Sequence, residues 1–311
     1  MSAAQIAGNV ARYSLEVGLV VGLAGFAPAL LRLRLPAAKL VFWHVMLAAC
    51  LLLPLGPWRQ EVWIVNVAPA LPAGASSAAP APVAAPAAAA DYSRDGILLA
   101  VLAAGVAARL AWLGLGLWRL RRYRLHSAPA HVEAARFAEG IARPVDLRIS
   151  EEVSSPVTFG FLRPVILLPA AFPLLDEPVR EAILAHEFLH VRRRDWLVTL
   201  LEEAVRAALW FHPAIWWLLG ETQLAREQTV DRAVVEMTRN REEYVDALLA
   251  IAGVQHRLDL APAPLFLRKR HLRHRVVSLV QEVGMSRKQV FSALTAGVCA
   301  VAAAAWLATA A

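Results

Sequence analysis

Cysteine and charge are both scarce in this sequence. The 311 residues include two cysteines, Cys50 and Cys299, and both lie in apolar segments, so neither a disulfide framework nor a cysteine metal site is indicated. Only 18% of the residues are charged, whereas 58% are hydrophobic and the mean hydropathy is positive. This composition is too apolar for an ordinary soluble protein and predicts a membrane protein.

Acidic residues are fewer than basic ones, which leaves a formal net charge of +7. The basic runs "RLRRYR" and "RRRDW" could indicate binding to nucleic acid. Both runs flank long apolar segments, however, where the arginine-rich character of cytoplasmic loops already accounts for them. We therefore expect a lipid bilayer and no direct nucleic acid among the partners.

Apolar segments that approach the length of a bilayer span, about 20 residues, occur in four places. Two lie within residues 1–56, a third at 96–118 and a fourth at 290–311. Residues 57–95 are mostly alanine and proline, a composition that buries no core and predicts an extended linker. The sequence therefore predicts four transmembrane helices.

Orientation follows from the arginines and lysines at the helix ends. Arg32, Arg34 and Lys39 fill the short turn between the first two helices, which places that turn in the cytoplasm. The same rule places the basic end of the third helix and the start of the fourth inside. Both termini and the 57–95 linker are then external, and residues 119–289 are cytoplasmic. A cell (inner) membrane location follows.

The 119–289 segment has the pattern of an α+β domain. The stretch "VDLRISEEVSSPVTFGFLRPVILLP" has β-branched runs broken by glycine and proline, which is typical of a small sheet. Apolar residues at three- and four-residue steps then predict one long helix over 179–210 and another over 214–239. We expect a small sheet beside two long helices.

An H-E-x-x-H motif lies in the first of these helices, in "LAHEFLHVRRRDW". His186 and His190 are four residues apart, so on a helix both imidazoles can reach one metal ion. Glu187, between them, can take a proton from a water molecule that zinc has acidified to a pKa of about 7. The motif predicts zinc-dependent hydrolysis of peptide bonds.

A catalytic zinc needs a third protein ligand, and "REQTVD" on the second helix offers one. Glu227 and Asp231 are four residues apart on one helical face, which allows Glu227 to bind the metal and Asp231 to orient a histidine ligand. Glu221 is the alternative third ligand, although it lies on a different face of the helix.

Taken together, "RPVILLP", "AILAHEFLHVRRRDWL", "WFHPAIWWL" and "REQTVDRAV" resemble the BlaR/MecR-type membrane metallopeptidases of β-lactam-sensing receptors. The resemblance implies a gluzincin-like zinc peptidase domain inserted into an α-helical multi-pass membrane protein. It implies Zn²⁺ bound by His186, His190 and Glu227, with Glu187 as general base and Asp231 in support. Val165, Ile166, Leu167 and Leu168 would then form the edge strand that holds the substrate.

The resemblance also implies a cytoplasmic protein substrate, a transcriptional repressor in a signalling response to antibiotics. Self-cleavage within the polar 267–284 connection is a weaker expectation. No Ser-x-x-Lys acylation motif occurs, so direct sensing of β-lactams is not indicated and a separate sensor protein is an open partner. The sequence is also compatible with a homo-oligomer.

The amino-acid sequence is compatible with two other functions. A housekeeping membrane protease of the HtpX or prenyl-protein endopeptidase kind shares H-E-x-x-H and Glu-x-x-x-Asp. The stretches "RPVILLP" and "WFHPAIWW" favour a BlaR/MecR-type peptidase instead. A non-catalytic scaffold could use zinc only to join two helices, but a structural site normally has four protein ligands. The intact Glu187 favours an enzyme.

Overall fold

The structure is a computed structural model that describes residues 3–55, 94–254 and 272–281 and the single positions 291, 295, 297 and 299. The expected 57–95 linker lies outside the described residues except for its last two positions, which begin a helix. The expected fourth membrane helix, 290–311, also lies outside them apart from those single positions.

Long apolar helices form one side of the molecule: α1 (Ala3–Leu30), α2 (Pro36–Leu52) and α3 (Arg94–Leu125). A 3-10 turn, η1 (Leu53–Leu55), follows α2. By length and composition, Gln5–Leu30 and Gly96–Leu125 are able to cross a membrane, whereas α2 is shorter. Helix α3 extends beyond the predicted end at residue 118 because the arginine-rich run continues the same helix. Its basic last turn suits the negative end of the helix dipole.

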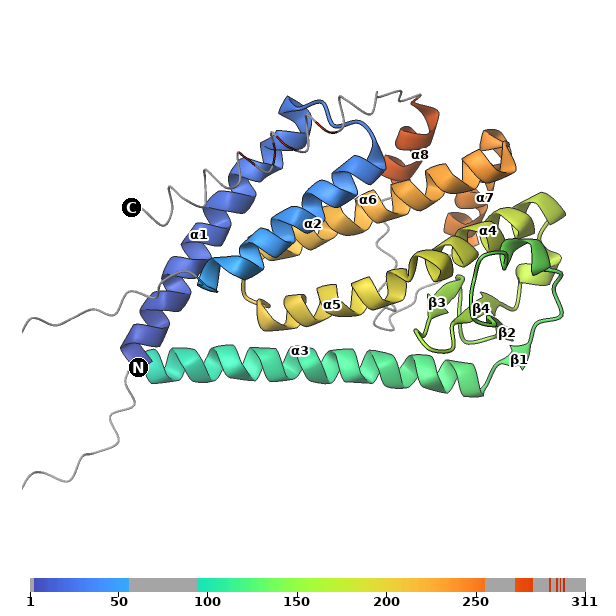
Figure 1. Cartoon of the computed structure of the whole chain (residues 1–311). Helices are drawn as coiled ribbons and strands as arrows, with labels where there is room; N and C mark the ends of the chain where they lie inside the picture. The colour runs from blue at the N-terminus through green and yellow to red at the C-terminus, as the bar shows by residue number, and fades with distance from the viewer. Residues whose placement is uncertain are drawn as a thin grey trace, which may run out of the picture.

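Helices α5 (Asp195–Ala208) and α6 (Pro213–Thr238) form a hairpin that packs among these apolar helices (Figure 1). The Trp210 indole donates a hydrogen bond to the Leu102 carbonyl oxygen of α3 at 3.1 Å, and His212 Nε2 lies 2.9 Å from the Ser14 carbonyl oxygen of α1. The turn of the hairpin therefore lies beside the middle of α1 and the first third of α3. The α5–α6 part of the predicted 119–289 segment thus packs directly on the apolar helices.

Apolar packing and buried charge both hold the hairpin in place. A core of buried residues joins α1, α2 and α6, with Phe42, Met46 and Leu218 at most 1% exposed. Within the hairpin, the guanidinium of Arg226 donates to the buried carboxylate of Glu202. A buried carboxylate of this kind is tolerated because it has a cationic partner.

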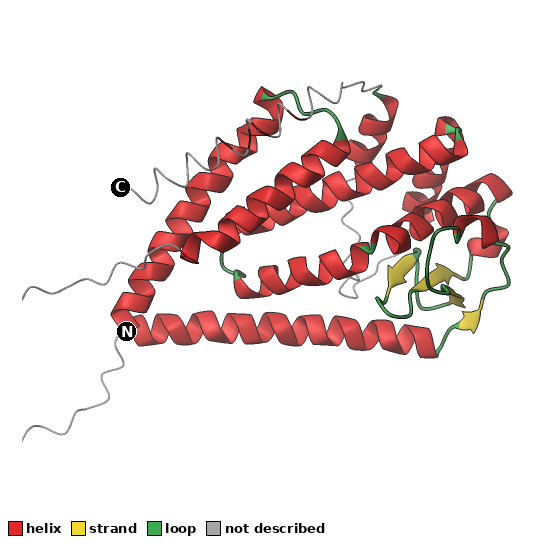
Figure 2. Cartoon of the chain, viewed as in Figure 1, coloured by secondary structure: helices red, strands yellow, loops and turns green. Residues whose placement is uncertain are grey.

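A four-stranded sheet with the order β1-β2-β4-β3 lies at one end of the molecule, beside α4 (Figure 2). Its strands are β1 (Ala128–Pro129), β2 (Asp146–Ser150), β3 (Val157–Phe159) and β4 (Val165–Pro169). β2 pairs with β4 in parallel, and the other two pairings are antiparallel. Of two 3-10 turns, η2 (Ala135–Phe137) lies between β1 and β2 in sequence, and η3 (Phe172–Leu174) follows β4.

The expectation that Val165, Ile166, Leu167 and Leu168 form an edge strand is wrong. β4 is hydrogen-bonded to β2 on one side and to β3 on the other, so its backbone has no side open to a peptide. All four side chains are fully buried. An apolar run of this kind is typical of an interior strand, and the edge position beside it belongs to β3.

The single helix expected over 179–210 is in fact two helices, α4 (Glu177–Arg193) and α5. Arg194 separates them in the left-handed conformation, with φ of 59°, and its N–H caps α4 at the carbonyl oxygens of His190 and Val191. This break changes the direction of the chain directly after the H-E-x-x-H motif. Helices α7 (Arg241–Val254) and α8 (Leu272–Val280) complete the described fold.

Candidate metal centre

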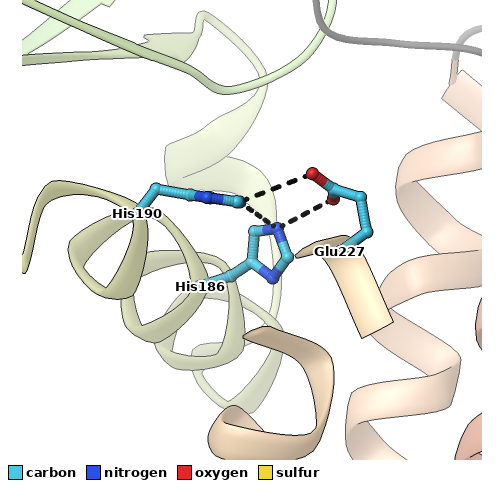
Figure 3. Close-up of side chains that lie close together, drawn as sticks. All are labelled: His186, His190 and Glu227. Atoms are coloured by element: carbon cyan, nitrogen blue, oxygen red, sulfur yellow. Dashed lines mark hydrogen bonds and ion pairs between the residues drawn. The ribbon is translucent and has the colours of Figure 1, made fainter. Parts of the chain in front are cut away.

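Three side chains from two helices meet beside the end of α4 (Figure 3). Each of His186, His190 and Glu227 offers one ligand atom, and these atoms all lie within 4.8 Å of one another. His186 Nε2 is 3.0 Å from His190 Nε2. The two carboxylate oxygens of Glu227 lie 3.6 and 3.8 Å from these nitrogens. The two helices therefore present two imidazoles and a carboxylate to one point.

Asp195 holds His190 from the opposite side of its ring. Its Oδ2 is 2.8 Å from His190 Nδ1, so the carboxylate accepts a hydrogen bond from that N–H and leaves the Nε2 lone pair facing the site. Burial alone lowers the pKa of His190, but the bond to Asp195 and the charges of Glu227 and Glu187 outweigh it and raise this pKa. The ring is thus oriented with Nε2 toward the site.

His186 is held through a tyrosine. Its Nδ1 lies 2.9 Å from the Tyr244 hydroxyl, which donates a hydrogen bond of 2.7 Å to Asp231. Asp231 Oδ1 itself is 3.5 Å from His186 Nδ1. Burial and the neighbouring Asp231 raise the pKa of Tyr244 well above its usual value, so its hydroxyl keeps its proton. Asp231 therefore orients His186 mainly through Tyr244.

Arg275 from α8 balances the acidic side of the site. It donates two hydrogen bonds to Asp231, of 2.8 and 2.6 Å, and its Nη1 lies 3.3 Å from Glu227 Oε2. Burial alone raises the pKa of Glu227, but Arg275 and the two histidines outweigh it and hold this pKa far below its usual range. Glu227 is therefore ionised at neutral pH, as a metal ligand requires.

Glu187 lies beside the ligands but points toward the sheet. Its Oε2 accepts a hydrogen bond of 2.5 Å from the Thr158 hydroxyl on β3. The residue is 9% exposed, so it is shielded without being sealed off. A carboxylate held in this way beside the two histidines is placed to exchange a proton with a molecule in the site.

The donor set fits a zinc ion. The outer nitrogens, Nδ1, of both histidines donate a hydrogen bond to a carboxylate or a hydroxyl oxygen, so in the neutral rings both inner nitrogens, Nε2, carry lone pairs. Two lone pairs 3.0 Å apart repel unless a proton or a metal cation lies between them. Two imidazoles and one carboxylate are the protein ligands of a common type of catalytic zinc site, which keeps its fourth position open.

The site contains all the predicted metal-site residues and several that the sequence did not reveal. His186, Glu187, His190, Glu227 and Asp231 lie together, whereas Glu221 is not part of the three-residue group found among the described residues. The residues that sequence reasoning missed are Thr158, Asp195, Tyr244 and Arg275. The sequence signal available for Asp195 was its place five residues after His190.

Comparison with known proteins identifies the family to which a chain with this site belongs. The family model described as BlaR1 peptidase M56 matches residues 28–279, most of the chain. The chain belongs to this family. Membership confirms the resemblance to BlaR/MecR-type peptidases and implies that the chain is a metallopeptidase.

The sequence identity between this chain and individual relatives is low. The chain is 28% identical over 140 residues to the regulatory protein BlaR1 of Bacillus licheniformis, which covers 44% of this chain and 23% of that protein. It is 26% identical over 104 residues to the methicillin resistance mecR1 protein of Staphylococcus aureus (strain Mu50 / ATCC 700699), which covers 32% and 17%. The chain thus spans less than a quarter of the length of these relatives.

Proposed function

We propose that this M56 family member is a membrane-embedded zinc endopeptidase. The observation that carries the proposal is the convergence of His186, His190 and Glu227. Each of them is held from outside the site. Tyr244 bonds to His186, Asp195 bonds to His190 and Arg275 pairs with Glu227. His186, His190 and Glu227 would hold the zinc, and Asp231 would orient His186. This arrangement leaves Glu187 as the group that moves the proton.

Peptide hydrolysis needs water to be activated and the leaving amine to be protonated. A bound zinc ion supplies Lewis-acid activation of water and of the scissile carbonyl. Glu187 accepts the proton of the attacking water at its carboxylate and then delivers it to the leaving nitrogen. Thr158 holds one oxygen of that carboxylate at 2.5 Å and so fixes its orientation.

The substrate would bind as an extra strand on β3. β3 is an edge strand of the described sheet, and its Thr158 touches Glu187, so this edge lies next to the reacting groups. Backbone pairing along Val157–Phe159 would supply affinity with little dependence on the substrate sequence. An extended segment of a protein is therefore the substrate class that the site favours.

The names of the relatives support a regulatory role. "Regulatory protein" and "methicillin resistance" point to a signalling response to antibiotics, and we propose a cytoplasmic transcriptional repressor as substrate, with self-cleavage as a further reaction. The signal would come from a separate sensor protein or from a part of a longer chain. The active centre would be cytoplasmic and both termini external, in accord with the basic turn at Arg32, Arg34 and Lys39.

The decisive experiment compares the wild type with Glu187→Gln, purified in the same detergent and loaded with zinc. Both should bind one zinc ion, because Glu187 is not among the three converging ligands. Cleavage of candidate repressors and of the chain itself should fall by about 10²- to 10⁴-fold in the variant, the usual contribution of a general base. Bound zinc is measured by elemental analysis and cleavage by electrophoresis.

Glu181→Gln is the matched control, because Glu181 lies on the same helix and forms an exposed ion pair with Arg136. It should cleave like the wild type. Cleavage by Glu187→Gln at the wild-type rate would refute the peptidase mechanism. Bound zinc without cleavage in any of the three proteins, with every candidate substrate, would favour the non-catalytic scaffold.

A further inference from the structure

A second concave site is lined by residues of the α1–α2 turn and the adjoining start of α2, of α6, of the first residue of α7 and of α8, and it does not include the three proposed metal ligands. Figure 1 locates these elements. The cavity has a volume of about 780 Å³. The turn contributes Arg34, the start of α2 contributes Lys39, and α6 contributes Arg232 from the side of the helix that also carries Gln228. Its size is within the range of about 300–1,000 Å³ that is typical of ligand sites.

The lining is strongly cationic. Arg34, Lys39, Arg232 and Arg241 line the cavity. Among the described residues of the lining, Glu236 is the carboxylate, and it pairs with Arg232 at 2.9 Å. Ser278 and Gln281 add polar groups from the α8 side. Cationic side chains with hydroxyl and amide groups among them are the groups that proteins use to bind phosphate.

One further carboxyl group faces this region from α6. Burial raises the pKa of Glu221, whereas Lys39 and His274 act on it in the opposite direction, and the net shift is upward. Even if Glu221 is counted as fully charged, Glu221 and Glu236 are two carboxylates beside four cationic side chains, Arg34, Lys39, Arg232 and Arg241. The balance of charge in the cavity stays positive.

The position of the cavity indicates where its ligand comes from. Arg34 lies in the turn that joins α1 to α2, and Lys39 in the first turn of α2, both close to the end of a helix able to cross a membrane. Under the membrane topology proposed above, this level is the headgroup region of the inner leaflet. Basic pockets between helices on that side are sites for anionic lipid headgroups.

We propose that this cavity binds the phosphate-bearing headgroup of an anionic phospholipid. The inference rests on the proposed membrane placement and goes beyond the proposed peptidase activity. A bound headgroup would join the α1–α2 turn to α6 and α8. Gln228 on α6 already bonds to the His274 carbonyl oxygen on α8 at 3.1 Å, and the next residue, Arg275, holds Glu227 and Asp231. The lipid would thereby support the metal centre from outside it.

The test uses the full chain in detergent, with lipid binding followed by native mass spectrometry. The probe is phosphatidylglycerol, with phosphatidylcholine as the lipid without net charge and glycerol phosphate as the soluble anion. Arg34→Gln with Lys39→Gln should weaken binding of phosphatidylglycerol by roughly 30-fold, since each cation at an anionic surface contributes about fivefold. Phosphatidylcholine should bind weakly to every variant.

The matched control is Arg32→Gln with Arg121→Gln, which removes the same charge from exposed basic positions that do not line the cavity. It should bind phosphatidylglycerol within twofold of the wild type. Equal loss in both double variants, or no loss in the first, overturns the proposal. Glycerol phosphate bound as tightly as phosphatidylglycerol, and lost in the first variant only, supports the anion site and assigns it to a soluble phosphate.

Failure of the membrane placement gives a different result. A chain that stays soluble without detergent and does not enter phosphatidylcholine bilayers would refute that placement, whatever happens in the cavity. A chain that enters bilayers but binds phosphatidylglycerol no better than phosphatidylcholine refutes the cavity proposal alone.

Discussion

The two proposed histidine ligands differ in how their outer nitrogens are held. His190 bonds directly to a carboxylate, Asp195, whereas His186 reaches Asp231 mainly through the Tyr244 hydroxyl. Burial raises the pKa of Asp195, but the bond from His190 and nearby arginines outweigh it, so this pKa is lowered and the group stays charged. A charged partner strengthens the ring as a donor to zinc more than a neutral hydroxyl does.

Asp195→Ala should therefore lower zinc affinity by about 10- to 100-fold, the usual effect of removing the group that orients a metal-bound histidine. The measurement is competition for zinc with a calibrated chelator. Asp176→Ala is the control, because Asp176 precedes the same helix α4 and its side chain forms no capping bond. Unchanged affinity in Asp195→Ala would mean that His190 is not a ligand or is oriented by another group.

Residue spacing alone predicted His186, Glu187, His190 and Glu227 because each lies in a helix of regular period. Asp195 was not predicted because, in the single long helix that was expected, its side chain would not face His190. The left-handed turn at Arg194 is what returns the Asp195 side chain to His190. Tyr244 and Arg275 come from α7 and α8, and their approach depends on tertiary packing that no local pattern records.

At the scale of elements, the contact between α3 and the α5–α6 hairpin is unusually close at Gly105. A methyl group added there would overlap the Trp210 indole, which also donates to the Leu102 carbonyl oxygen. Gly114 on the same helix has nothing within 4 Å of such a group. The hairpin thus uses a gap that only glycine leaves in α3.

Gly105→Ala should destabilise the protein by about 1–3 kcal/mol through overpacking, even though alanine favours a helix by about 1 kcal/mol. Gly114→Ala should be neutral or stabilising, since it brings the helix preference without the overlap. Thermal unfolding in detergent, followed by tryptophan fluorescence, compares the two. A loss of stability of equal size in both variants would contradict the close packing of Trp210 on α3.

The sheet shows a second limit of sequence reasoning at this scale. The apolar run at Val165–Pro169 correctly predicted a strand, but the pattern of one strand does not state which neighbours pair with it. Its burial on both faces is a sign of an interior position, which the pairing with β2 and β3 confirms. β1 has two residues, too few to give a pattern.

For the whole molecule, the metal centre is where four helices meet. His186 and His190 come from α4, Glu227 from α6, Tyr244 from α7 and Arg275 from α8. A ligand that binds only the folded state stabilises it by mass action. Zinc should therefore act on the stability of the whole helical assembly and not only on its own ligands.

Removing zinc with a chelator should lower the unfolding temperature by on the order of 10 °C. At 1,000 times its dissociation constant a ligand contributes about 4 kcal/mol, and each kcal/mol shifts the midpoint of a chain of this size by roughly 2–4 °C. Differential scanning calorimetry in detergent measures the shift.

Glu187→Gln should keep the zinc-dependent shift, whereas His190→Ala should lose it. His126→Ala, at an exposed histidine paired with Glu152, is the control and should behave like the wild type. A full shift in His190→Ala would show that zinc stabilises the fold from another site.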